Sequence, residues 1–115
     1  MSIGKQIYQQ RCQHCHGQNG EGLGKLYPPL DSADYLVENK EKLSCIIRHG
    51  QAGPIVVNGI EYNQVMPSNP DLLEDDIAQL STYILNAWSN EEGLVEKEDV
   101  LKQLENCENQ DFSLH

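Results

Sequence analysis

The amino-acid sequence predicts an all-α domain that carries one small β-hairpin and an extra helix near its C-terminus. Three observations support this fold class. Apolar residues recur at helical spacing in several segments, an Asn-Gly pair lies between two short β-prone runs near residues 55–62, and the composition becomes strongly acidic after residue 90. Only 38% of the 115 residues are hydrophobic, so a cofactor, a metal or a cross-link is expected to complete so thin a core.

Three longer segments are predicted to be helices of the main domain: residues 2–12, 39–49 and 74–89. Gly50 ends the second of them, and acidic residues open the third, where they favour the positive end of the helix dipole. A short helical turn is expected around residues 35–37. The apolar positions that define the three helices are Ile3, Ile7, Tyr8, Leu43, Ile46, Ile47, Ile77, Leu80, Ile84 and Trp88.

The hairpin is expected because Asn58-Gly59 favours a tight two-residue turn with positive φ. Beyond the main domain the chain is rich in acids, yet apolar residues still recur at helical spacing, which predicts an amphipathic helix at about 96–107. We therefore expect two parts. These are a domain over residues 1–90 and an acidic C-terminal extension over residues 91–115.

The formal net charge is −10, from 18 acidic and 8 basic side chains. Such a chain is not expected to bind nucleic acid, because the phosphate backbone would repel it. The charge is uneven, since residues 1–30 carry a balance of +2 and residues 31–115 one of −12. No apolar run of about 18 residues or more is present, so no transmembrane segment is expected, and the first residues do not resemble a secretory signal peptide.

Two thiols and two imidazoles fall within the stretch RCQHCHG, residues 11–17. A structural zinc site usually needs a second pair of Cys or His ligands, whereas Cys45 and Cys107 stand alone. A thioredoxin-like thiol-disulfide centre needs a strand before the motif, but the preceding residues are predicted to be helical. Covalently attached haem is the third interpretation, because C-x-x-C-H is its attachment signature.

Other features support the haem interpretation. On a helical turn Cys12, Cys15 and His16 share one face, so two thiols can reach one haem edge while the imidazole turns to the iron. Met66, in a loop that contains proline, offers a thioether as a second axial ligand. The carbonyl of Pro28 can accept a hydrogen bond from the other ring nitrogen of the imidazole, as an iron-bound His requires.

With these residues in place, the sequence resembles a class I, single-haem cytochrome c of the bacterial kind over about residues 2–90. The attachment motif, the proline after it and the methionine loop match the family pattern. So does Gly4, since a small residue there lets the first helix cross a later one closely. Further matching positions on these two helices are Tyr8, Leu80 and Tyr83. The resemblance implies the cytochrome c fold, in which helices surround a covalently bound haem.

The resemblance also implies roles for single residues. One haem c is expected, with a proximal and a distal iron ligand. A low-spin iron with both axial positions filled has no open position for a substrate. The implied function is therefore outer-sphere electron transfer by a carrier that is not an enzyme. The residues concerned are Cys12 and Cys15 for the covalent attachment, His16 and Met66 for the iron, and Pro28 for the hydrogen bond to the proximal imidazole.

Several other side chains allow two interpretations. Arg48 and Tyr62 are candidates for binding a haem propionate, as is Asn63, but a solvated Arg48 fits the sequence equally well. His14 is expected at the surface. His49 is expected at a helix end, where the dipole favours an imidazolium, with a distal iron ligand as the alternative.

Cys45 and Cys107 remain after the haem attachment is assigned. Covalent attachment of this kind resembles that of proteins assembled outside the cytoplasm, where disulfides are permitted. Each of the two cysteines falls on or near the apolar side of its predicted helix. We therefore expect a Cys45–Cys107 disulfide that holds the acidic extension to the domain, with two separate buried thiols as the alternative.

The expected partners are redox proteins: an oxidase, a reductase or a dehydrogenase. The expected location is extracytoplasmic, in the periplasm or at the outer face of a membrane, with any signal peptide or anchor absent from this chain, and the expected state is a monomer. Two other functions stay open from the sequence. One is a haem c electron-entry domain excised from a larger redox enzyme, and the other is a ligand-binding haem sensor in which Met66 is absent from the iron or easily displaced.

Overall fold

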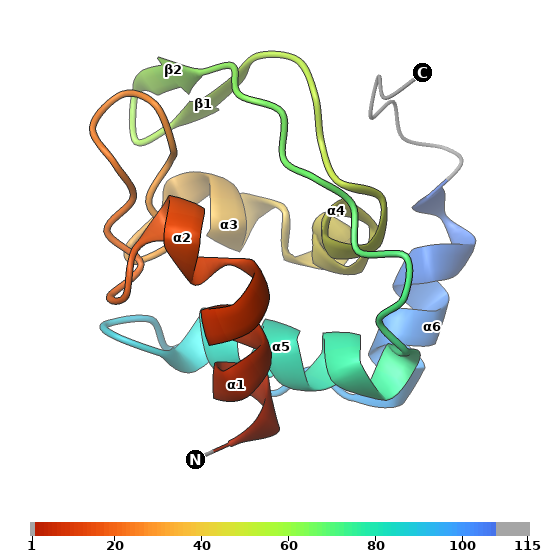
Figure 1. The fold of residues 1–115 in the computed structure, drawn as a ribbon. Helices are drawn as coiled ribbons and strands as arrows, with labels where there is room; N and C mark the ends of the chain where they lie inside the picture. The colour runs from red at the N-terminus through yellow and green to blue at the C-terminus, as the bar shows by residue number, and fades with distance from the viewer. Residues whose placement is uncertain (1, 108–115) are drawn as a thin grey trace.

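The fold is mainly helical with one two-stranded sheet, which confirms the predicted fold class. In Figure 1, α1 lies across α5, while α4 and α6 lie toward the other end of α5. The computed structural model describes residues 2–107. The elements are α1 (Ile3–Arg11), α2 (Gln13–His16), α3 (Asp34–Glu38), the 3₁₀ helix η1 (Lys40–Lys42), α4 (Leu43–His49), β1 (Ile55–Val57), β2 (Ile60–Tyr62), α5 (Glu74–Asn86) and α6 (Lys97–Glu105).

The first predicted helix, residues 2–12, corresponds to α1, and a second short helix, α2, follows it. The hydroxyl of Ser2 accepts from the Lys5 amide at 3.1 Å and caps α1, which ends at Arg11. Cys12 then leaves the helical conformation, with φ −122° and ψ −32°, before α2 begins. This bend gives the four-residue helix α2 its own direction, so the end of the motif is not a simple continuation of α1.

α1 crosses α5 at Gly4, as the small-residue argument predicts. A Cβ atom on Gly4 would collide with the backbone carbonyl of Gln79 and with the Cβ of Tyr83. Tyr8, one helical turn further on, is completely buried in the same contact. Only glycine, whose side chain is a hydrogen atom, allows the backbones of α1 and α5 to approach this closely.

We expect Gly4→Ala to destabilise the fold, although the same change on an open helix stabilises it by about 1 kcal/mol. The added methyl group must push α1 away from the backbone of α5, and overpacking of this kind costs about 2 kcal/mol. Chemical denaturation of the haem-loaded protein measures the difference. Lys5→Ala, at an exposed neighbouring position, is the control and should change stability by less than about 0.5 kcal/mol. A Gly4→Ala protein more stable than the parent would contradict the expectation.

α5 starts as predicted but ends three residues early. The carboxylate of Asp76 accepts from the backbone N–H of Leu73 at 3.0 Å and closes the first turn. Past Asn86 the backbone becomes extended at Ala87, and Trp88 takes a positive φ of 57°. The cause is tertiary, because the amides and hydroxyls that follow the helix bond to a segment near residue 30.

Asn90 is the centre of that tertiary connection. Its side-chain amide donates to the carbonyls of Leu30 and Ile84, each at 3.0 Å, and its side-chain oxygen accepts from the amide of Ser32 at 2.9 Å. The chain must turn away from the helix axis for one side chain to reach all three groups. The helix was predicted to reach residue 89 because the periodicity of apolar residues gives no information about partners so far away in the sequence.

The hairpin forms where the Asn-Gly pair predicts it. β1 and β2 are antiparallel, and Val57 pairs with Ile60 across the turn. Asn58 and Gly59 have φ values of 52° and 82°, as a tight turn with two positive φ angles requires. Asn58 also exchanges two hydrogen bonds with Asp34 at the start of α3, of 3.0 and 2.7 Å, which hold the hairpin to that helix.

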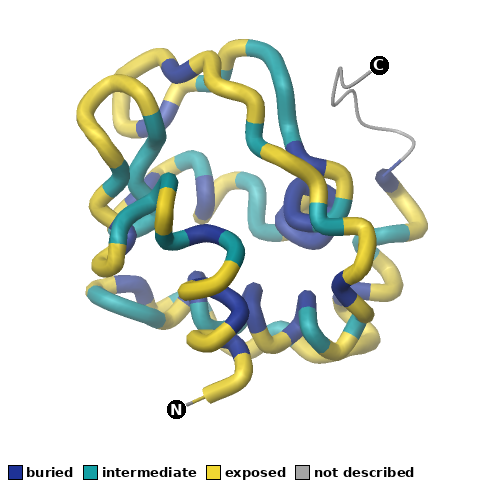
Figure 2. The backbone as a smooth tube through the Cα atoms, in the orientation of Figure 1, coloured by how far each residue is buried: buried dark blue, intermediate teal, exposed yellow. Residues whose placement is uncertain are grey.

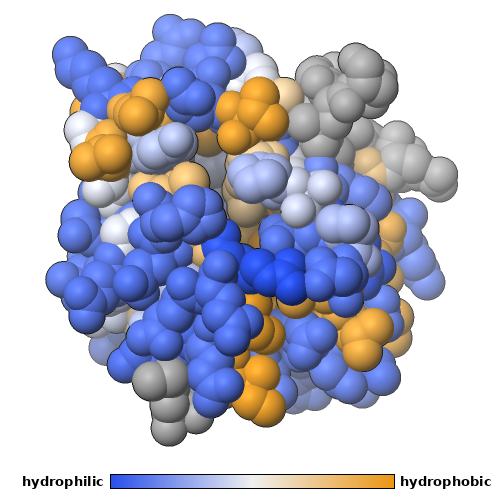
Figure 3. Space-filling model, viewed as in Figure 1, coloured by the Kyte–Doolittle hydropathy of each residue, from blue (hydrophilic) through white to orange (hydrophobic). Residues whose placement is uncertain are grey.

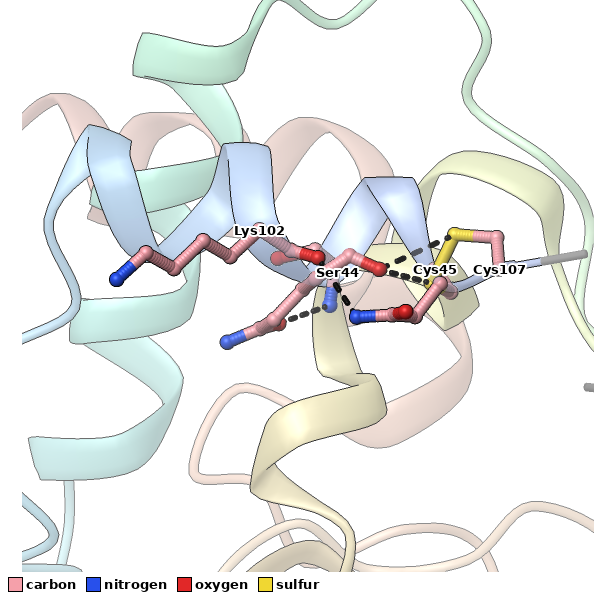
Figure 4. Close-up of a disulfide and its surroundings, with 6 residues drawn as sticks. Ser44, Cys45, Lys102 and Cys107 are labelled. Carbon is pink, nitrogen blue, oxygen red and sulfur yellow. Dashed lines mark hydrogen bonds between the residues drawn. A yellow bond between two sulfur atoms is a disulfide. The ribbon is translucent and has the colours of Figure 1, made fainter. Parts of the chain in front are cut away.

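α6 packs on α4 and α5 through its buried residue Val100. A disulfide joins Cys45 on α4 to Cys107 just beyond α6, as Figure 4 shows. Beside it, the side-chain oxygen of Gln103 accepts from the amide of Ser44 at 3.1 Å. The last residues of the predicted extension, 108–115, lie outside the described part of the chain.

Buried residues come from every helix that surrounds the middle of the molecule except the short α2 and η1 (Figure 2). The completely buried side chains include Tyr8 of α1, Ile77 and Leu80 of α5, and Val100 of α6. Within residues 2–107, no helix is both long enough and apolar enough to cross a membrane.

Candidate functional site

A large, mostly apolar cavity lies between α1–α2, α3, α4, the hairpin and the loop before α5. Its volume is about 1150 Å³ when the solvent in its mouth is included. Aliphatic side chains from α3, α4, β1 and α5 form much of its wall: Leu36, Ile46, Ile47, Val57 and Ile84. The face in Figure 3 is hollowed near its centre, with hydrophilic side chains below the opening and hydrophobic ones at its upper edge. A cavity with this lining suits a large, flat and apolar ligand.

Cys12, Cys15 and His16 all line this cavity. The carbonyl of Cys12 accepts from the amides of Cys15 and His16, at 3.2 and 2.9 Å, so the three residues share one helical turn. Burial raises the pKa of the Cys12 thiol to about 12. Both thiols are free in the structure and lie on the cavity side of the turn, where they can form covalent bonds to a ligand inside it.

His16 is fixed by Pro28. Its Nδ1 lies 2.8 Å from the Pro28 carbonyl oxygen. Because a carbonyl can only accept, Nδ1 carries the hydrogen, and Nε2 is left with its lone pair toward a metal. Burial lowers the pKa of His16, against the opposing effect of the Pro28 carbonyl, and so favours the neutral imidazole that a metal requires.

The loop between the two residues is itself anchored. Gly22 donates to the His16 carbonyl at 2.7 Å, and Leu30 donates to the Gly20 carbonyl at 2.8 Å. Gly20 packs so closely against the ring of Trp88 that any Cβ atom there would collide with it. The Tyr8 hydroxyl donates to the Gly17 carbonyl at 2.6 Å. The position of Pro28, and through it the orientation of the imidazole, therefore depends on both α1 and the chain after α5.

Met66 also lines the cavity, and its backbone is held on both sides. Its amide donates to the Gln51 carbonyl at 2.8 Å, and its carbonyl accepts from the Gln51 amide at 3.1 Å. Gly50 allows this pairing, because a Cβ atom there would collide with the Met66 carbonyl. The only described sulfur ligand outside the attachment motif and the disulfide is thus placed at the cavity by a short two-way backbone bridge.

Of the side chains predicted to bind a haem propionate, Tyr62 lies at the cavity and Arg48 does not. Tyr62 is buried at the cavity wall, and its hydroxyl lies 3.4 Å from the Gly24 carbonyl. Arg48 is not at the cavity. Its guanidinium donates to the Leu72 carbonyl at 2.7 Å and to Glu74 at 3.0 Å, and so ties α4 to the start of α5. The structure therefore offers Arg48 a structural role, and its predicted contact with a propionate stays a prediction.

His14 and His49 are both exposed. His14 reaches the cavity mouth, while His49 and Asn63 do not line the cavity. Within residues 2–107, no group of three or more His, Cys, Asp or Glu side chains is arranged to hold a metal ion by itself.

Sequence reasoning missed three residues that the structure places at the site. Gln51 bridges Met66, and Arg11 and Asn69 line the cavity where α1 meets the loop before α5. The position of Arg11 directly before the attachment motif gives no sign of a partner far along the chain. For Asn69, the preference of Asn for turns was the one available signal, and it says nothing about the bonds that the side chain makes.

The donor set fits an iron porphyrin bound by covalent links. Two thiols on one helical turn match two attachment points, a neutral imidazole with a fixed Nδ1–H matches one axial ligand, and a thioether matches the other. The apolar wall would exclude water from the iron and the macrocycle. These residues fit haem c in chemistry and in number.

Comparison with known proteins supports the same ligand. The chain matches the family model described as Cytochrome c over residues 1–88. It is 37% identical over 91 residues to cytochrome c-552 of Thermus thermophilus, and this match covers 76% of this chain and 69% of that protein. The match to the cytochrome c-552 of a particular strain of the same species has the same identity and covers 61% of that protein. The cytochrome c subunit of the alcohol dehydrogenase (quinone) of Gluconacetobacter polyoxogenes is 31% identical over 102 residues, which are 86% of this chain and 22% of that subunit.

Proposed function

Because this chain belongs to the cytochrome c family, as a class I monohaem member, we propose that it is an electron carrier whose single haem c is ligated by His16 and Met66. Members of this family carry electrons on a haem c attached through cysteines. One observation carries the assignment of residues: Cys12, Cys15, His16 and Met66 line a single apolar cavity.

Each residue then has a defined task. Cys12 and Cys15 form the thioether links, and the Pro28 carbonyl keeps the His16 ring in one tautomer and one orientation. Met66 supplies a thioether ligand, which favours reduced iron and raises the reduction potential above that of bis-His ligation. When bound, the haem supplies the one-electron couple. With the iron held by His16 and Met66, no position would be left for a substrate, and the chemistry supplied would be outer-sphere electron transfer.

We further propose that the domain comprises residues 1–90, that residues 91–115 form an extension, and that the protein acts as a monomer outside the cytoplasm. The Cys45–Cys107 disulfide suits an oxidising compartment such as the periplasm or the outer face of a membrane. The partners would be redox proteins such as an oxidase, a reductase or a dehydrogenase. These proposals concern a chain that matches 61 to 69% of the length of its c-552 relatives.

A second candidate is a haem c domain through which electrons enter a larger redox enzyme. The match to 22% of a cytochrome c subunit of an alcohol dehydrogenase favours it, since a domain of this kind can form part of a longer subunit. The site chemistry is the same in both cases. They differ in the partner and in whether transfer occurs within one assembly or between diffusing proteins.

Visible spectroscopy of the protein, matured in a host that attaches haem c, tests the proposed function. We expect the pyridine derivative of the reduced protein to report two thioether links, and the oxidised protein to show the weak far-red band of a Met–iron bond. A pyridine spectrum typical of free vinyl groups would contradict the attachment. A missing far-red band together with rapid carbon monoxide binding would favour a ligand-binding sensor.

A further inference from the structure

We propose that Arg11 is a latch: it holds the Met66 loop, residues 63–73, against the end of α1 directly before the attachment motif, and it thereby keeps small external ligands from replacing Met66 on the iron. The proposal rests on the His16/Met66 ligation put forward above. It adds a function for a residue that neither binds the haem covalently nor ligates the iron. Arg11 and Asn69 both line the cavity at the junction that the latch would close.

The first step is the contact between α1 and the loop. The two terminal nitrogens of Arg11 donate to the two carboxylate oxygens of Asp71, at 3.0 and 2.6 Å. One of these nitrogens also donates to the side-chain oxygen of Asn69 at 3.1 Å. A planar guanidinium that engages a carboxylate at two points fixes both distance and orientation, which a Lys ammonium does not.

Asn69 then carries the restraint to α4. Its side-chain nitrogen donates to the Ile47 carbonyl at 3.0 Å, and its backbone amide donates to the Arg48 carbonyl at 3.0 Å. These carbonyls belong to the last turn of α4, where helix carbonyls lack partners within the helix. Asn69 therefore joins α1, through Arg11, to α4, and it lies three residues after Met66.

The Met66 loop has few other restraints of its own. Val65, Pro67 and Ser68 are exposed, so burial contributes little to holding this part of the chain. At Met66 itself the bridge to Gln51 restrains the backbone, and further along the loop the next bonds are those of Asn69 and Asp71. Loss of the Arg11 contacts would leave the far side of the loop attached through α4 alone, and local opening would become more frequent.

The size of the effect follows from the exposure of the pair. The Arg11 and Asp71 side chains are 31% and 64% exposed, so their ion pair adds little to global stability. Opening of the loop is a local event in which these contacts are a large share of what breaks. We therefore expect an effect on ligand replacement that exceeds the effect on unfolding.

The experiment measures how fast imidazole displaces Met66 from the oxidised haem protein, by the loss of the far-red band at about pH 8.5, where imidazole is neutral. We expect Arg11→Gln and Asp71→Asn each to accelerate displacement about three- to tenfold, and the double variant to be no faster than the quicker single one. Arg11→Lys, which keeps the charge but loses the two-point contact, should fall between. In the parent, high salt should accelerate displacement, and in Arg11→Gln it should not.

Lys40→Gln is the matched control. It removes another surface ion pair, between Lys40 and Glu92 at 3.2 Å, which does not touch the Met66 loop. Its displacement rate should equal that of the parent. The latch is overturned if Arg11→Gln keeps the parental rate, or if Lys40→Gln accelerates displacement equally. A parent protein without a far-red band would instead overturn the His16/Met66 ligation, so the two failures are distinguishable.

Discussion

Removal of the Cys45–Cys107 disulfide is expected to lower the free energy of unfolding by about 4 kcal/mol. The two cysteines are 62 residues apart, and the chain-entropy model gives this value for a closed loop of that length. For a domain of this size the change corresponds to a fall in the melting temperature of roughly 15 °C. Thermal unfolding of the Cys45→Ala/Cys107→Ala protein, followed by circular dichroism, measures it.

Reduction of the disulfide with a thiol reagent provides an independent check on this prediction. Intact mass should rise by two hydrogens when the parent is reduced after unfolding, and the reduced protein should melt close to the double variant. An unchanged mass would show that the two thiols are separate. Because the disulfide lies outside the cavity lining, the oxidised double variant should keep the far-red band at moderate temperature. Its loss would mean that α6 supports the site more directly than the contacts indicate.

The second large effect is expected from Met66→Ala. Loss of the thioether opens one axial position, so the far-red band should vanish and the reduced protein should bind carbon monoxide. The reduction potential should fall by a substantial part of the roughly 0.8 V range over which axial ligands move haem potentials. Spectra with and without carbon monoxide, and a potentiometric titration, measure these changes.

Two other variants separate ligation from general disturbance of the loop. Ser68→Ala changes an exposed residue two positions further on and should leave spectrum and potential unchanged. Met66→His should restore a six-coordinate iron at a potential lower than that of the parent, since imidazole replaces a thioether. A Met66→Ala protein that kept the far-red band would refute the proposed ligand.

Features that depend on neighbours in the sequence could be predicted from it. The hairpin rests on the positive φ angles that Asn58 and Gly59 tolerate, and the helical turn of the attachment motif rests on spacing alone. The crossing at Gly4 was also within reach, because a single missing side chain on an apolar helix face is a local signal. The predicted fold class was confirmed for this reason.

Features that depend on distant partners could not be predicted. α5 ends at Asn86 because Asn90 bonds to Leu30 and Ser32, which no periodicity reveals. Arg48 was considered for a propionate because a lone cation near a haem suggests one. Its actual partners lie 24 and 26 residues away, in a loop and helix whose placement depends on the whole fold. The Arg11 contacts, 58 and 60 residues apart, are of the same kind.

The hydrogen bond between Asn90 and Leu30 spans 60 residues, and Gly4 meets α5 more than seventy positions along the chain. Long-range closures of this kind form late, because the entropy of a long loop must be overcome first. A chain that is synthesised from its N-terminus therefore exposes the thiols of Cys12 and Cys15 well before α5 exists to cover them. We therefore expect haem to be attached to an incompletely folded chain, and the rest of the fold to form around the haem afterwards.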